Sequence, residues 1–123
     1  WLFTGSDTGH VKRISVENRA VDKNFGQVCD DEIWRMKIPD DEKKLLVADY
    51  CGFLKLISAT DGELIKDFGQ IHEECITGII ITEDQKFFFT SSRDGDLKQW
   101  DFRDNTLVRH HLEINNWISC LCL

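Results

Sequence analysis

Histidine and cysteine are the residue types in this chain best suited to chemistry. The histidines are His10, His72, His110 and His111, and the cysteines are Cys29, Cys51, Cys75, Cys120 and Cys122. These side chains can pair as nucleophile and general base, or can bind a soft metal ion such as zinc. Either kind of site needs several of them at suitable spacings, so their spacing decides what they can do.

The spacings favour neither a catalytic site nor a metal site. His110 and His111 are adjacent on an expected strand, so their side chains point to opposite faces. Cys120 and Cys122 share a face, but the sequence shows no second ligand pair for a metal. The chain contains no G-x-S-x-G, P-loop or H-E-x-x-H motif. We therefore expect no enzyme activity, metal or cofactor, with a Cys/His metal or hydrolase site as a remote alternative.

Composition narrows the class of protein further. The 123 residues carry a net charge of −7, and 41% are hydrophobic and 30% charged, which is typical of one soluble globular domain. The acidic excess argues against nucleic-acid binding, and no apolar run approaches the ~20 residues of a membrane span. The odd cysteine count, without a C-x-x-C pair, predicts reduced thiols and a cytoplasmic protein. Because the first residue is Trp1 and no signal peptide follows it, we expect the chain to begin inside a longer gene product.

Two residue types recur every 43 residues along the chain. A glycine begins each copy, a lysine follows three positions later, and an apolar residue stands immediately before the lysine. The glycines are Gly9, Gly52 and Gly95, and the lysines are Lys12, Lys55 and Lys98. A period of this length indicates stacked or radially arranged supersecondary units.

Each unit predicts four short antiparallel strands joined by turns. Buried strands are expected as apolar runs, such as residues 75–81, and turns as clusters of acidic residues and glycine. The organisation expected for the single segment 1–123 is strands two to four of a first unit at 1–25, a second unit at 33–68, a third at 75–112, and the first strand of a following unit at 117–123. No helical apolar stripe is present, so the expected fold class is all-β.

The third unit resembles a WD repeat. Residues 94–101, Asp-Gly-Asp-Leu-Lys-Gln-Trp-Asp, are similar to the closing signature of that family. His72 stands where the family has a Gly-His pair, although the nearest glycine, Gly69, is not immediately before it. The resemblance is strongest over residues 69–112 and weaker earlier. It implies a β-propeller of four-stranded blades that acts mainly in protein–protein interaction.

The resemblance also implies a buried hydrogen-bond chain in the third blade. Its members would be His72, Ser92, Asp94 and Trp100. A buried indole N–H needs an acceptor, a hydroxyl can relay, and an imidazole can donate to a carboxylate. These residues are therefore expected to be structural. The second unit lacks the chain, because Cys51 and Ile57 stand in the positions of the aspartate and the tryptophan.

Three blades are fewer than the roughly four to eight that close a propeller. Two explanations stay open. We favour a segment of a larger propeller. Alternatively, two chains form a homodimeric six-bladed ring, in which residues 117–123 of one chain complete the first blade of the other.

The alternating direction of the strands places the turns between second and third strands on the same rim as the links between blades. The candidate partner-binding residues on this rim are Asp7, Asp30, Asp31, Glu32, Tyr50, Glu73, Glu74 and Arg93. With Asp94, acids outnumber Arg93 by seven to one, whereas the opposite rim mixes acids with bases. One-sided charge favours a complementary partner, so we expect a basic protein segment or peptide here.

Aromatic residues near this rim are candidate anchors for the partner. They are Trp34, Tyr50 and Trp117, although the two tryptophans lie in expected first strands and are interpreted as core residues. Two alternatives remain open. The acids keep the loops soluble and bind nothing, or the segment is purely architectural within a large cytoskeletal or ciliary assembly.

Overall fold

The computed structural model describes residues 1–113 and 116–123, and its regular structure is β-strand throughout. The first sheet contains β1 (Leu2–Gly5), β2 (His10–Ser15) and β3 (Ala20–Gln27). The second contains β4 (Ile33–Lys37), β5 (Lys44–Asp49), β6 (Phe53–Ser58) and β7 (Leu64–Gln70). The third contains β8 (Ile76–Ile81), β9 (Phe87–Ser92), β10 (Asp96–Asp101) and β11 (Thr106–Glu113).

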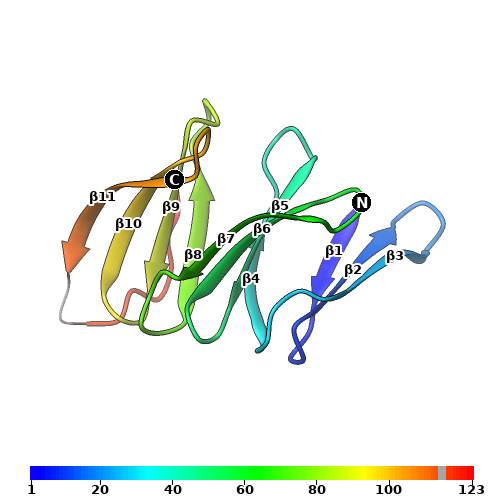
Figure 1. Ribbon diagram of the computed structural model, residues 1–123, viewed down its shortest axis with the longest axis horizontal. Helices are drawn as coiled ribbons and strands as arrows, with labels where there is room; N and C mark the ends of the chain where they lie inside the picture. Colours follow the sequence, from blue (N-terminus) through cyan, green and yellow to red (C-terminus); the bar gives the residue numbers. More distant parts are fainter. Residues whose placement is uncertain (114–115) are drawn as a thin grey trace.

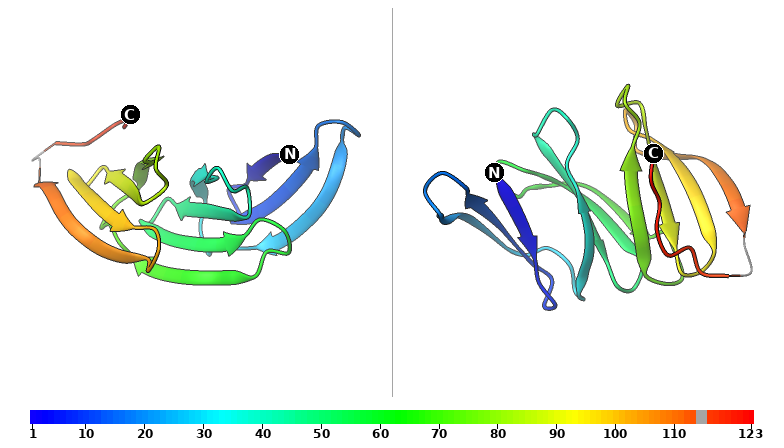
Figure 2. Two further views of the ribbon diagram at one scale, coloured as in Figure 1. Left: turned by 90° about the horizontal axis from the view of Figure 1, so that it is seen from above. Right: turned by 180° about the vertical axis from the view of Figure 1, so that it is seen from behind.

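Every strand pairs antiparallel with its neighbours in chain order, and the three sheets stand side by side (Figure 1). Seen from above, they follow an open crescent with β3, β7 and β11 along the convex side (Figure 2). This arrangement confirms the expected all-β class. The described residues include no helix of the length and apolarity needed to cross a bilayer.

The middle sheet is buried on both faces, which explains the unbroken apolar run of β5. Leu45 and Val47 point into a core shared with the first sheet, where they meet Val11. Leu46 and Ala48 point the other way into a core shared with the third sheet. Because both sets of alternating side chains are covered, neither face of this strand needs polar residues.

Aromatic rings fill the core between the second and third sheets. Phe88 stacks on Trp100 at a centroid distance of 5.9 Å, and the ring of Phe68 meets the Trp100 ring edge-on at 5.5 Å. Phe102 adds a further edge contact to Phe88 at 5.3 Å. This packing fixes the Trp100 indole, whose N–H must then find an acceptor inside the core.

The repeated glycines lie where the link between two blades crosses a turn. Gly9, Gly52 and Gly95 have φ values of 76°, 86° and 89°, in the left-handed region that favours glycine. A Cβ on Gly52 would lie 2.1 Å from the carbonyl oxygen of His72. A Cβ on Gly9 would lie 1.9 Å from the carbonyl oxygen of Cys29. Glycine is therefore required sterically at the first two of these positions, and the positive φ favours it at the third.

The repeated lysines fasten the same crossings. Lys55 donates from Nζ to the carbonyl of Val28 at 2.8 Å, and Lys98 donates to the carbonyl of Ile71 at 2.5 Å. Each acceptor is in the link that follows the previous sheet. A lysine of the third strand in a blade thus binds the link that leads into that same blade.

Residues 117–123 form no strand, contrary to expectation. The segment lies against the third sheet, where Ile118 N donates to Ser92 O at 3.2 Å and Thr77 Oγ1 donates to Ile118 O at 2.6 Å. A Cβ on Gly78 would approach Leu121 Cβ to 2.8 Å. The segment packs on β8 much as β8 packs on β4, but no neighbouring strand among the described residues supplies the ladder of hydrogen bonds that defines a strand.

Candidate functional site

A buried hydrogen-bond chain runs through the third sheet. Trp100 Nε1 lies 3.1 Å from Thr90 Oγ1, and that hydroxyl lies 2.8 Å from His72 Nε2. His72 Nδ1 lies 3.0 Å from a carboxylate oxygen of Asp94. One direction of donation satisfies every atom: the indole donates to the hydroxyl, the hydroxyl to Nε2, and Nδ1–H to the carboxylate. This assigns a neutral imidazole protonated on Nδ1.

The surroundings of His72 and Asp94 favour these protonation states. Burial lowers the pKa of His72, and the Asp94 carboxylate opposes this without overcoming it. Partial burial works against ionisation of Asp94, but amide donors at Asp96 and Glu73 together with His72 leave its pKa lowered. His72 and the hydroxyl residue Thr90 are 2% and 0% exposed, so the relay lies inside the core and we interpret the imidazole as a structural link between the indole and the carboxylate.

The relay hydroxyl belongs to Thr90, so the expectation that placed Ser92 in the chain is wrong. Ser92 Oγ donates to the carbonyl of Glu74 at 3.0 Å and accepts from the Asp94 amide at 3.1 Å. The two residues share a face of β9 because they are two positions apart. Ser92 lies next to the β9–β10 turn and bonds within that turn, while Thr90 lies two residues further along β9, opposite Lys98 and within hydrogen-bond reach of the indole. The sequence feature that could have identified Thr90 is that it is a second hydroxyl residue on the same face of the strand as Ser92.

In the second sheet, thiols and apolar residues stand in place of the buried hydrogen-bond chain. Val47 and Ile57 stand 43 positions before Thr90 and Trp100, and both pack in the core with Cys29. Burial raises the pKa of Cys29 to about 12. Cys51 donates from Sγ to Asp31 at 2.9 Å, and this hydrogen bond raises the pKa of the Cys51 thiol to about 11. Neither thiol is a ready nucleophile at neutral pH.

One group of side chains has the composition of a metal site, but its ligand atoms are already engaged in other contacts. Ligand atoms of His72, Asp94 and Asp96 lie within 4.8 Å of one another. However, the His72 nitrogens belong to the buried chain, and Asp96 contacts Lys98 at 3.5 Å and His110 at 2.9 Å. A metal ion would have to displace these contacts, so the residues do not fit one.

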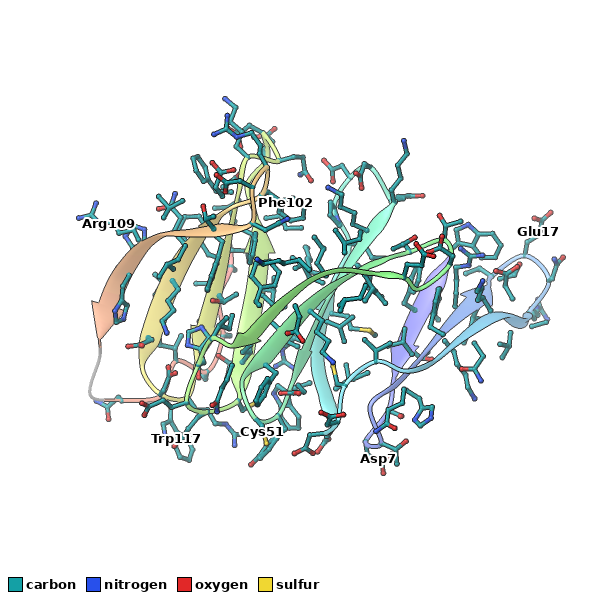
Figure 3. The ribbon with its side chains drawn as sticks, viewed as in Figure 1. Asp7, Glu17, Cys51, Phe102, Arg109 and Trp117 are labelled. Carbon is teal, nitrogen blue, oxygen red and sulfur yellow. The ribbon has the colours of Figure 1, made fainter. Side chains whose placement is uncertain are left out.

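The turns after β1, β5 and β9 meet the links β3–β4 and β7–β8 at one edge, here called the link rim (residues 6–9, 28–32, 50–52, 71–75 and 93–95). Backbone hydrogen bonds join turn to link: Ile33 N to Ser6 O, Tyr50 N to Glu32 O, and Arg93 N to Cys75 O, at 2.8–3.1 Å. Asp7, Cys51 and Trp117 mark this edge in Figure 3, with Phe102 and Glu17 toward the opposite edge.

Six carboxylates of the link rim face solvent or lie half-buried. They are Asp7, Asp30, Asp31, Glu32, Glu73 and Glu74. None of the six forms an ion pair with a residue that the structure describes. Asp94, the seventh acid of the rim, is committed to the buried chain. The link rim therefore presents uncompensated negative charge.

A pocket of about 240 Å³ opens beside the link rim in front of the second sheet. Its lining includes Asp30, Asp31, Asp49, Asp67 and the single amine of Lys55. The amine is already bound to the Val28 carbonyl. Asp49 is 3% exposed, and burial raises its pKa despite amide hydrogen bonds from Phe53 and Cys51.

Aromatic rings surround Arg93 at the rim. Its guanidinium carbon lies 5.6 Å from the Trp34 ring centroid, 5.8 Å from that of Tyr50 and 5.3 Å from that of Trp117. Tyr50 is 42% exposed and Trp117 is 70% exposed, while Trp34 is half-buried. The interpretation of Trp117 as a core residue is therefore wrong, because its segment lies on the surface of the sheet without a further strand over it in the described chain. Arg35 also contacts Trp34, and nothing in the sequence pattern distinguishes it from other strand residues.

Comparisons with known proteins agree with this geometry. The family model described as "WD domain, G-beta repeat" matches residues 62–101. None of the curated proteins compared with the chain matches it.

Two solved structures show how far the likeness extends. The WD40 β-propeller domain of Doa1 superimposes with a TM-score of 0.83 at 17% identity, over 96% of this chain and 38% of that one. The computationally designed Ika4 protein superimposes with a TM-score of 0.82 at 18% identity, over 98% of this chain and 72% of that one. This chain thus spans well under half of the Doa1 domain. Residues 62–101 match the model of a WD repeat, and the three sheets have the fold of consecutive blades of a β-propeller.

Proposed function

We propose that this chain is a non-catalytic interaction scaffold whose link rim binds a basic segment of a partner protein. WD40 propellers generally act as protein-interaction platforms and generally do not catalyse reactions. The observation that carries the proposal is the set of six rim carboxylates without an ion-pair partner in the part of the chain that the structure describes. A basic segment supplies the missing charges.

The pocket beside the rim suits one lysine or arginine side chain of that segment. Phe53, which is 39% exposed, offers an apolar wall for the aliphatic stem, and four aspartates surround the space for the charged head. The Lys55 amine competes little, because it is bound to the Val28 carbonyl at 2.8 Å.

The opposite edge of the blades lacks this one-sided charge. Its turns carry both signs and pair some of them internally, with Arg103 at 2.8 Å from Asp101 and Lys86 at 3.6 Å from Asp84. Internal pairing reduces the field that a partner meets. Charge therefore favours the link rim over the opposite edge as the docking face.

The test is charge reversal at each edge with the same change in net charge. A lysine- and arginine-containing peptide is selected on the purified chain from a display library, and its affinity is measured by fluorescence anisotropy. Glu73→Lys with Glu74→Lys is expected to weaken binding about tenfold or more. Glu17→Lys with Glu83→Lys, on the opposite edge, is expected to change it less than about threefold. Equal losses at both edges, or no loss at the link rim, would overturn the proposal.

The remaining sequence-based hypotheses stay predictions. These are the architectural role in a cytoskeletal or ciliary assembly, the homodimeric ring and the cytoplasmic location. No contact among the described residues favours any of them over the binding role of the link rim.

A further inference from the structure

Two arginines converge on the half-buried Trp34, which lies beside the link rim. The guanidinium carbons of Arg35 and Arg93 lie 5.8 Å and 5.6 Å from the centroid of the Trp34 ring. Arg35 comes from β4 and Arg93 from the β9–β10 turn, so neighbouring blades supply one each. Both cations also act on the buried Cys75 thiol, where they oppose the desolvation that raises its pKa.

Neutral groups hold both arginines in place. Arg35 donates from Nε to the carbonyl of Thr77 and from Nη1 to the carbonyl of Trp34, each at 2.7 Å. The Arg93 guanidinium lies among Trp34, Tyr50 and Trp117, with a long contact of 3.5 Å to the Tyr50 hydroxyl. Stacking on aromatic rings positions a guanidinium while leaving its charge uncompensated.

No ion pair joins Arg35 or Arg93 to a carboxylate among the side chains that the structure describes, at residues 1–111 and 116–123. Arg13 and Arg103 differ, since Arg13 pairs with Asp22 and Arg103 pairs with Asp101. Arg35 is exposed and Arg93 half-buried, so both keep N–H donors that a partner can reach. The natural acceptor for such donors is an oxyanion, which a guanidinium binds through two parallel hydrogen bonds.

The surrounding charge selects among oxyanions. Six unpaired carboxylates occupy the same rim, and their field repels a doubly charged phosphate more than a singly charged carboxylate. We propose that Arg35 and Arg93, positioned around Trp34, bind one carboxylate side chain of a partner peptide. The flanking basic residues of that peptide face the acidic rim, and this part rests on the proposed function. The expected partner segment is then a basic stretch of chain that contains one acidic residue.

The experiment compares three peptides that differ at one central residue: KRKEKRK, KRKQKRK, and the same sequence with phosphoserine at the centre. Affinities are measured by anisotropy, and the Nε–H signals of ¹⁵N-arginine-labelled protein are followed by NMR. The glutamate peptide is expected to bind about five- to tenfold more tightly than the glutamine peptide. It is also expected to bind more tightly than the phosphoserine peptide. The Arg35 and Arg93 signals should move, and those of the paired Arg13 and Arg103 should not.

Variants identify the residues responsible. In Arg93→Gln the preference for glutamate over glutamine should fall to less than about twofold. Among the described residues the Arg93 side chain makes one long hydrogen bond and three aromatic contacts near the surface, so this variant should melt at a lower temperature than the parent chain and stay folded. Equal affinity of the glutamate and glutamine peptides, with both bound at the rim, would overturn the carboxylate site and leave the proposed function standing. Tighter binding of the phosphoserine peptide would overturn the choice of carboxylate.

A small probe keeps the two proposals separable. If no basic peptide binds, the proposed function fails, and the carboxylate site is then tested with N-acetylglutamate amide alone at millimolar concentration. The site predicts saturable movement of the Arg35 and Arg93 signals and no such movement with N-acetylglutamine amide. Absence of this difference would refute the site.

Discussion

Replacing Thr90 by valine tests the buried hydrogen-bond chain. Valine has nearly the shape of threonine, so the change removes the hydroxyl without opening a cavity. The Trp100 N–H, at 3.1 Å from that hydroxyl, and His72 Nε2, at 2.8 Å, would both lose their partner inside the core. An unpaired buried polar group costs about 1–3 kcal/mol, so we expect a loss of about 2–4 kcal/mol in the free energy of unfolding. At this chain length the melting temperature should fall by roughly 8–16 °C.

The assay is urea unfolding followed by far-UV circular dichroism, with Thr106→Val as the matched control. Thr106 is exposed, and its hydroxyl donates to the Asp104 carboxylate in the adjacent turn. The control variant should therefore change the free energy of unfolding by no more than about 0.5 kcal/mol. Trp100→Phe removes the donor, so the double variant with Thr90→Val should cost less than the sum of the single changes. A Thr90→Val loss equal to that of the control, or strict additivity in the double variant, would refute the reasoning.

Three further changes test the turn, the histidine and the thiol. Gly52→Ala should lower the free energy of unfolding by at least about 3 kcal/mol, because the new Cβ would meet the His72 carbonyl oxygen. The control Gly69→Ala has a φ of 71° and open space around the new Cβ, so it should lower that free energy by about 1–2 kcal/mol. Equal losses of stability in thermal melts would contradict the steric explanation. Because the pKa of His72 is lowered by burial, the free energy of unfolding should be maximal above the ordinary value of 6.5 and fall as pH drops below it, since the unfolded chain then binds the extra proton. His72→Asn should flatten that dependence between pH 6.5 and 5, and an unchanged slope in urea titrations would argue against it. Asp31→Asn should release the Cys51 thiol, whose pKa is raised to about 11, and speed its alkylation by iodoacetamide at pH 8 severalfold; an unchanged rate would exclude the hydrogen bond as the cause.

Periodic features made the fold predictable from sequence. The glycines and lysines every 43 residues mark the crossings of turn and link, and both have steric or hydrogen-bond reasons to recur. The apolar run Leu45–Ala48 of β5 is covered on both faces, because its alternating side chains enter two different cores. Residues 117–123 show the limit of such patterns, because apolar alternation makes a strand only where a neighbouring strand offers a ladder of hydrogen bonds.

Individual side-chain roles were harder to predict. Thr90 and Ser92 are equivalent in pattern, and only the depth of each along β9 decides which one meets the indole. Arg35 carries no sequence signal, since its role depends on Trp34 and on Arg93 from the neighbouring blade. Contacts between blades join residues far apart in sequence, and a repeat pattern does not specify which side chains meet there.

The most direct test of the central claim is a footprint of the bound peptide. A basic peptide selected on the chain is added at saturation, and backbone amide shifts are mapped by NMR over both edges. The account predicts changes concentrated at residues 28–32 and 71–75 and at Trp34, with small changes at the opposite turns 39–42 and 82–86. A footprint centred on those opposite turns would contradict the assignment of the link rim as the binding face.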